Sequence, residues 1–270
     1  MVNEGAHFTE DRPGSTRDVS VRKLHSRWAI MHVTQRDGAL DLLKWLALLS
    51  MVLDHLRYIG LPLDLLYVPG RLAFPWFCLA MAANLARPAA VPGDGVRQWR
   101  YLGWLLLFSL LSEIPYRLYI PDPGVLNVLP TLALGLLVAR GWQQPDIQAR
   151  GLGLVALLLG ALFSERLMFG VFGVLLPLAT LLVIRKPWFF AVLPGLVCLA
   201  ANEWEALIAA SRHGNTLAEV AFGVCLIAPL GGLLLLRGVR QCSPPPMRRW
   251  AYALYPVHFL LLLGLRQVLS

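Results

Sequence analysis

The feature that most constrains the fold is an apolar stretch, residues 41–57, that has the character of a bilayer helix yet carries charged side chains. Lys44 lies near its start, and Asp54 with His55 lies near its end. Charges in hydrocarbon are unfavourable and rare, and they usually face a partner or a cavity. At about 100° per residue, Lys44 and His55 lie on one helix face, roughly 16 Å apart. The sequence therefore predicts a site along this face.

The composition favours a polytopic membrane protein. Hydrophobic residues make up 57% of the 270 residues and charged residues only 15%, a balance that argues against a soluble domain. A net charge of +8 would suggest nucleic acid in a soluble chain, but here the basic residues punctuate apolar segments, as in membrane proteins. Because no nucleic-acid-binding motif is present, we expect no such partner. The four cysteines have neither metal-ligand nor disulfide-framework spacing, so no metal is expected.

The chain divides by composition into two parts. Residues 1–38 are polar and basic, and we expect them to form a largely disordered cytoplasmic arm, with a short interfacial helix around 21–33. Residues 39–270 are expected to form an all-α transmembrane bundle of about nine helices. These predicted helices lie near 39–59, 71–87, 99–115, 125–140, 151–163, 168–184, 188–201, 217–237 and 250–268. Lys and Arg concentrate in the segments on the same side as the arm, which predicts a cytoplasmic N terminus.

With that topology, polar residues from several helices converge on the outer side and predict a single cleft there. They are Asp54, His55, Arg71, Glu113, Arg117 and Asn127, with His258 nearer the middle of the last helix. Simpler interpretations stay open. The arginines can extend to lipid headgroups, Asp54 and Glu113 can be their structural partners, and His258 can bond a carbonyl that the nearby proline frees.

Histidine is the strongest candidate for the chemistry. Its pKa lies near neutrality, so His55 can accept a proton from an attacking amine or hydroxyl. Adjacent side chains in a helix point about 100° apart, so direct pairing with Asp54 is not expected, and Glu113 or Glu165 from another helix is an equally good orienting partner. We therefore predict His55, Asp54 and Glu113 as catalytic residues. No Gly-x-Ser-x-Gly motif is present, and no cysteine has a cationic context.

Several motifs in order along the chain carry a family resemblance. They are the stretches 43–55, 70–77, 99–116, 126–135, 170–173 and 252–258. Through them the chain resembles the TraX family, membrane proteins associated with N-terminal acetylation of conjugative pilin. The family is in turn similar to membrane acyltransferases whose first helix carries a basic residue, ten intervening residues and a histidine. Lys44 and His55 reproduce that spacing. Their paired-arginine motif has no clear counterpart here, and at Glu165 the chain departs from the TraX pattern.

The resemblance implies an acetyltransferase of the bacterial inner membrane that spans the bilayer several times. It implies acetyl-CoA as the donor, a pilin or another membrane-associated acceptor, a role for His55 at the acyl-transfer centre and one for Lys44 toward the donor. The expected substrate-binding residues are Lys44, Arg71, Tyr116, Arg117, Asn127 and His258. Coenzyme A phosphates are expected near Arg87, Arg97, Arg100 and Lys44.

Three other functions remain open at this stage. The acceptor can be a glycan or lipid hydroxyl, which keeps the same chemistry. Asp54 and His55 can form the proton relay of a transporter, although no later segment repeats the pattern of Lys44 and His55, as internal repeats of secondary transporters often do. A non-enzymatic scaffold would leave the ionisable residues of the apolar helices without a purpose.

Overall fold

The computed structural model describes residues 38–87, 94–239, 242–247 and 249–269, with the backbone alone for 94–98. The chain divides into two units, Met1–Asp37 and Gly38–Ser270. The predicted cytoplasmic arm and its interfacial helix therefore lie outside the described residues, apart from Gly38.

The described residues form helices and no strand, which confirms the predicted all-α class. The longer helices, in chain order, are α2 (Gly38–Leu56), α4 (Ala73–Leu85), α5 (Asp94–Tyr119), α6 (Val128–Gln143), α7 (Ile147–Leu162), α8 (Gly170–Val183), α9 (Val192–Ala201), α10 (Trp204–Arg212), α11 (Thr216–Gly238) and α12 (Ala251–Leu269). The short helical turns are η1 (Asp64–Leu66), α3 (Tyr67–Gly70), η2 (Ser164–Arg166) and η3 (Trp188–Ala191).

Each predicted apolar segment contains a helix. Only some of these helices are long and apolar enough to cross a membrane. Among the described residues, three helical stretches are long and apolar enough to span a bilayer by themselves: Asp64–Leu85, Thr216–Gly238 and Ala251–Leu269. A fourth candidate is the pair Trp188–Ala201 and Trp204–Arg212, which is bent by 76°. Other helices are shorter than the roughly 20 residues of a straight span or carry charges. The predicted number of nine spans stays a prediction.

Side-chain caps explain where several helices begin. Asn127, Asp146 and Asn215 each accept a hydrogen bond from a backbone N–H in the first turn of α6, α7 and α11. Such caps satisfy donors that the helix itself leaves unpaired. The helix predicted near 125–140 therefore begins just after Asn127, as α6.

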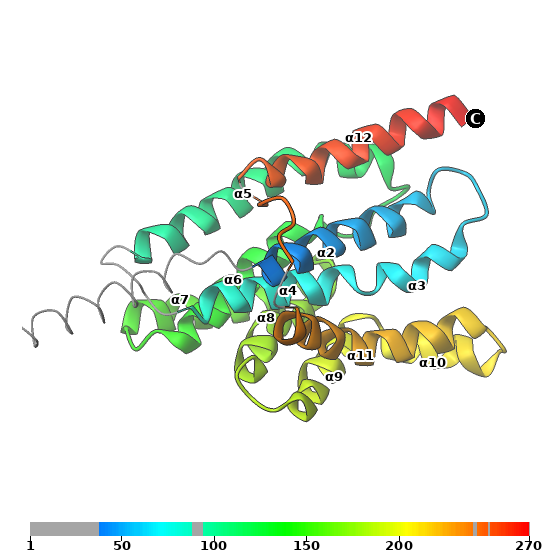
Figure 1. The fold of residues 1–270 in the computed structure, drawn as a ribbon. Coiled ribbons are helices and arrows are strands. Elements are labelled where there is room, and N and C mark those ends of the chain that lie inside the picture. The colour runs from blue at the N-terminus through cyan, green and yellow to red at the C-terminus, as the bar shows by residue number, and fades with distance from the viewer. Residues whose placement is uncertain (1–37, 88–93, 240–241, 248, 270) are drawn as a thin grey trace, which may run out of the picture. The chain divides into compact units, whose positions relative to one another are not determined.

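The helices pack as a bundle with two ends (Figure 1). At the end that holds Lys44, Arg185 donates to the carbonyl of Ala86, and Arg237 donates to the carbonyls of Ile184 and Lys186. These bonds join the C-terminal ends of α4, α8 and α11. We call this the Lys44 end.

The opposite end, which we call the His55 end, is joined by other bonds. The hydroxyl of Tyr119 donates to the carbonyl of His55 over 2.6 Å, and Arg266 donates to the carbonyl of Tyr119 over 2.8 Å. In Figure 1, α12 lies along α5 and α2 lies along α4. The main core cluster draws on these helices and on α6, and it includes the fully buried Phe259 and Leu136.

Candidate active site

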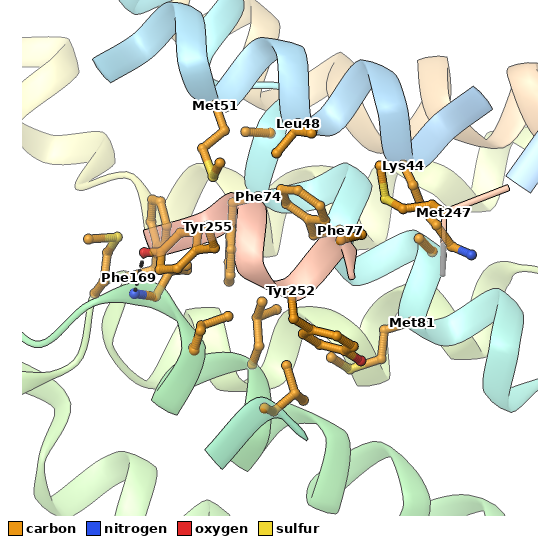
Figure 2. A pocket seen from close by; sticks show the side chains of 18 of the residues that line it. Lys44, Leu48, Met51, Phe74, Phe77, Met81, Phe169, Met247, Tyr252 and Tyr255 are labelled. Atoms are coloured by element: carbon orange, nitrogen blue, oxygen red, sulfur yellow. Dashed lines mark hydrogen bonds between the residues drawn. The ribbon is translucent and has the colours of Figure 1, made fainter. Parts of the chain in front are cut away.

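A cavity of about 490 Å³ lies between α2, α4, α5, α6 and α12. Lys44, Leu48, Met51 and His55 all line it, so it follows one face of α2 for three turns. Figure 2 shows Lys44, Leu48 and Met51 following one another along this helix. The helix face predicted from the spacing of Lys44 and His55 is therefore the wall of a real cavity.

The middle of the cavity is apolar and aromatic. Phe74 and Phe169 are stacked with ring centroids 4.1 Å apart, and Phe77, Met81 and Tyr252 also line this part (Figure 2). An apolar passage with polar groups at its ends suits an elongated ligand with an uncharged middle, since most small-molecule sites combine apolar walls with a few placed polar groups.

The Lys44 end of the cavity is bordered by the segment that leads into α12. Met247 and Arg249 line the cavity there, and the Trp45 indole donates to the carbonyl of Pro245 over 2.9 Å. The ammonium group of Lys44 lies 3.5 Å from the carboxylate of Asp41. Figure 2 places Lys44 beside Met247 at one end of the passage. This end presents cationic side chains beside an apolar passage.

At the other end of the cavity, two histidines from distant parts of the chain meet. The Nδ1 atom of His55 lies 2.8 Å from the Nε2 atom of His258, although the residues are 203 positions apart. The two rings are stacked at 5.0 Å with an interplanar angle of 16°. His258 is buried, at 7% exposure, and Phe259 packs against both rings. The side chain that orients His55 is thus a second histidine, where the sequence had suggested a carboxylate.

The hydrogen bonds of the pair assign its tautomers. The Nδ1 atom of His258 lies 3.2 Å from the carbonyl oxygen of Leu254, which can only accept, so this nitrogen carries the proton. In a neutral ring the Nε2 atom of His258 then accepts, and His55 donates to it from Nδ1. The Nε2 atom of His55, which points away from His258, is left with its lone pair. His55 lines the cavity, so the site contains a base with a fixed tautomer.

Asp54 has different partners from its neighbour. One of its oxygens, Oδ1, lies 3.1 Å from Nη2 of Arg57 and 3.4 Å from Nη2 of Arg71. Gly70 packs directly against this carboxylate, because a Cβ atom at that position would lie 2.5 Å from Oδ1. Asp54 and Arg71 both line the cavity. The absence of a bond from Asp54 to the adjacent histidine agrees with the roughly 100° between neighbouring side chains in a helix.

The structure places Glu113 in a separate network at the start of α6. Its carboxylate accepts hydrogen bonds from Arg117 over 2.6 Å and from the amide of Asn127 over 2.7 Å. Asn127 is fully buried and caps α6, while Arg117 is exposed. Tyr116 is buried against Phe259. None of these four residues is among those that line the cavity, and their predicted catalytic or substrate-binding roles stay predictions.

Sequence reasoning missed several residues of the site. Asn202 accepts a hydrogen bond from Arg71 over 2.7 Å, and Met247 and Arg249 line the Lys44 end. Asn202 carried a usable signal, because a polar residue inside an apolar run is a functional candidate. Met247 and Arg249 follow a run of three prolines, and nothing local indicates that this segment returns to α2. Of the arginines expected near coenzyme A phosphates, Arg97 lies among residues whose side chains are not described.

Long apolar helices around a cavity with polar ends define a helical membrane protein. A family model described as TraX protein matches residues 39–266. The chain belongs to the TraX family, and the match covers every element of the site.

The chain also matches parts of two curated relatives. The chain is 30% identical over 112 residues to Protein TraX of Escherichia coli, which is 41% of this chain and 43% of that protein. It is 33% identical over 98 residues to Protein TraX of Escherichia coli strain K12, which is 36% of this chain and 39% of that protein. Each match thus covers less than half of the relative's length. No solved structure matches the chain.

Proposed function

We propose that this protein is an integral-membrane acetyltransferase that moves an acetyl group from acetyl-CoA to an amine, and that the amine is the N terminus of a pilin subunit. The observation that carries the proposal is the contact of His55 with His258 at one end of a cavity that begins at Lys44. The choice of a pilin amine as the acceptor rests on the family, which is associated with pilin acetylation. The wider relation to membrane acyltransferases is part of the same proposal.

The proposed orientation places the Lys44 end at the cytoplasm and the His55 end at the outer half of the bacterial inner membrane. Arg185 and Arg237 gather at the Lys44 end, and loops rich in Lys and Arg are typically cytoplasmic. The donor would then enter from the compartment that contains acetyl-CoA. The acceptor would approach from the other side.

The length of the cavity suits this donor. The pantetheine arm of coenzyme A is of order 15 Å long, comparable with the roughly 16 Å that eleven residues of α2 span. Lys44 and Arg249 would lie near the phosphates, and the apolar middle would hold the arm. The thioester would then lie beside His55. A volume of about 490 Å³ is within the usual range of small-molecule sites.

The chemistry needs only groups that the site and its substrates contain. The nitrogen of a neutral amine attacks the thioester carbonyl carbon, a C–N bond forms, and the carbonyl π electrons move onto oxygen. His55 accepts the proton that the amine nitrogen loses. When the C=O bond re-forms, the C–S bond breaks and the thiolate takes the proton back from His55. The products are an amide and free coenzyme A, and His55 returns to its starting tautomer.

The proposal is tested by following label from radiolabelled acetyl-CoA in nanodiscs that contain the purified full chain and candidate acceptors. The acceptors are a pilin subunit, a pilin with a chemically blocked N terminus, and membrane glycolipid. We expect label on the first acceptor alone. Label on glycolipid would show that the acceptor is a hydroxyl and not an amine. The absence of both donor binding and transfer would contradict the proposal and leave a transporter or a scaffold.

A further inference from the structure

Arg71 is held rigidly at the cavity by three elements. Its Nη1 donates to Asn202 at the break between α9 and α10, and its Nη2 lies 3.4 Å from Asp54 on α2. Its guanidinium carbon lies 4.2 Å from the ring centroid of Tyr67. Asn202 is itself fixed, because its amide donates to the carbonyl of Cys198 over 2.8 Å. The position of the guanidinium is therefore determined before any ligand binds.

Two properties of Arg71 are not explained by these contacts. Its Nε atom is buried and has no hydrogen-bond partner in the part of the chain that the structure describes. Asp54, its carboxylate partner among the described residues, also pairs with Arg57, so these three residues together carry one surplus positive charge. An unpaired buried donor is unfavourable, and so is a surplus charge in a partly buried cluster. A negatively charged oxygen in the cavity, which Arg71 lines, would compensate the surplus charge.

We infer that the guanidinium of Arg71 donates a hydrogen bond to the oxyanion that forms when the acceptor attacks the donor thioester. The inference rests on the proposed function, because the oxyanion exists only if transfer occurs. Arg71 and His55 line the same cavity, so the carbonyl oxygen can face the guanidinium while the attacking nitrogen faces the imidazole. Negative charge moves onto this oxygen as the C–N bond forms and leaves it as the C–S bond breaks.

A preformed donor of this kind acts on the transition state more than on the bound substrate. Removing one oxyanion donor typically lowers kcat by about 10²–10³-fold. A cation that merely held the donor in the cavity would instead change its affinity. Substitution of Arg71 should therefore lower kcat if Arg71 stabilises the oxyanion, and should weaken donor binding if Arg71 only holds the donor.

The test compares wild-type protein with Arg71→Ala and Arg71→Lys in nanodiscs, with donor binding and the transfer rate at saturating donor as readouts. We expect Arg71→Ala to bind acetyl-CoA within about threefold of wild type and to transfer at least 10²-fold more slowly. Added guanidinium chloride should restore part of its rate, whereas equal concentrations of sodium chloride should not. Guanidinium should not restore His55→Ala.

Arg71→Lys keeps the charge near Asp54 but lacks the planar guanidinium and its Nε–H. We expect Arg71→Lys to transfer at least tenfold more slowly than wild type, at unchanged thermal stability. If Arg71→Ala does not fold, Arg71→Lys alone tests the inference. Wild-type transfer rates in either folded variant, or a loss confined to donor affinity, would overturn the inference and leave the proposed function intact. A wild-type chain that transfers nothing would overturn both.

Discussion

The Nδ1 atom of His55 and the Nε2 atom of His258 lie 2.8 Å apart, and this contact joins the first and last helices of the described bundle. It fixes the tautomer of the histidine that lines the cavity. The second ring nitrogen of His258 is bound to the carbonyl of Leu254 in its own helix. The orientation of α12 therefore determines the state of the proposed base on α2.

Replacing His258 by Ala should slow transfer without removing the donor site. The variant frees the Nδ1 atom of His55, so both the tautomer and the ring orientation are no longer fixed. We expect the transfer rate to fall by about 10²-fold, in the range typical of general-base catalysis, with acetyl-CoA affinity within about threefold of wild type. The matched control is His213→Ala, because His213 is exposed at the end of α10. Equal rates for both variants would contradict the role given to His258.

A bulky side chain in the middle of the cavity should prevent donor binding. Leu48 lines the cavity, whereas its neighbour Leu49 is 54% exposed on the outer face of α2. We expect Leu48→Trp to weaken acetyl-CoA binding at least tenfold and Leu49→Trp to leave it unchanged, as measured by equilibrium binding to protein in nanodiscs. Donor binding by Leu48→Trp at wild-type affinity would show that the donor lies elsewhere.

The close approach of Gly70 to Asp54 makes a further prediction. A methyl group at Gly70 would collide with the carboxylate, so Gly70→Ala should displace Asp54 from its two arginines. We expect a loss of about 1–3 kcal/mol in the free energy of unfolding, typical of overpacking. Gly103→Ala is the control, since nothing lies within 4 Å of a Cβ atom there. Thermal unfolding in detergent measures the stability of both variants. Equal stability of Gly70→Ala and Gly103→Ala would contradict this packing.

The network around Glu113 predicts an effect on stability alone. Its carboxylate accepts hydrogen bonds from Arg117 and from both the backbone and side-chain amides of Asn127. We expect Glu113→Gln and Asn127→Ala each to lower the free energy of unfolding by about 1–2 kcal/mol. The transfer rate per folded molecule should stay unchanged in both. A loss of transfer in folded Glu113→Gln would instead support the catalytic role predicted from the sequence.

Local periodicity explains which parts of the site could be predicted. Lys44 and His55 lie in one helix, where regular geometry fixes relative positions, so their shared face follows from spacing alone. This is a property of a single helix, and the structure confirms that both residues line one cavity.

The contacts between helices could not be predicted in this way. The pairing of His55 with His258 depends on how α2 and α12 pack, which no short-range pattern encodes. The break at Asn202 and the return of Arg249 to the Lys44 end likewise depend on tertiary packing. Because the sequence could not show these partners, it left carboxylates of other helices, such as Glu113, as the candidates for orienting His55.

The most direct test of the account is a single-turnover measurement of acetyl transfer with wild-type and His55→Ala protein, each loaded with radiolabelled acetyl-CoA before a pilin acceptor is added. Donor binding should be within about threefold in the two proteins, because His55 acts on the acceptor's proton. The account predicts rapid label transfer by the wild type and at least a 10²-fold slower transfer by the variant. Equal transfer by a folded His55→Ala protein would contradict the central claim.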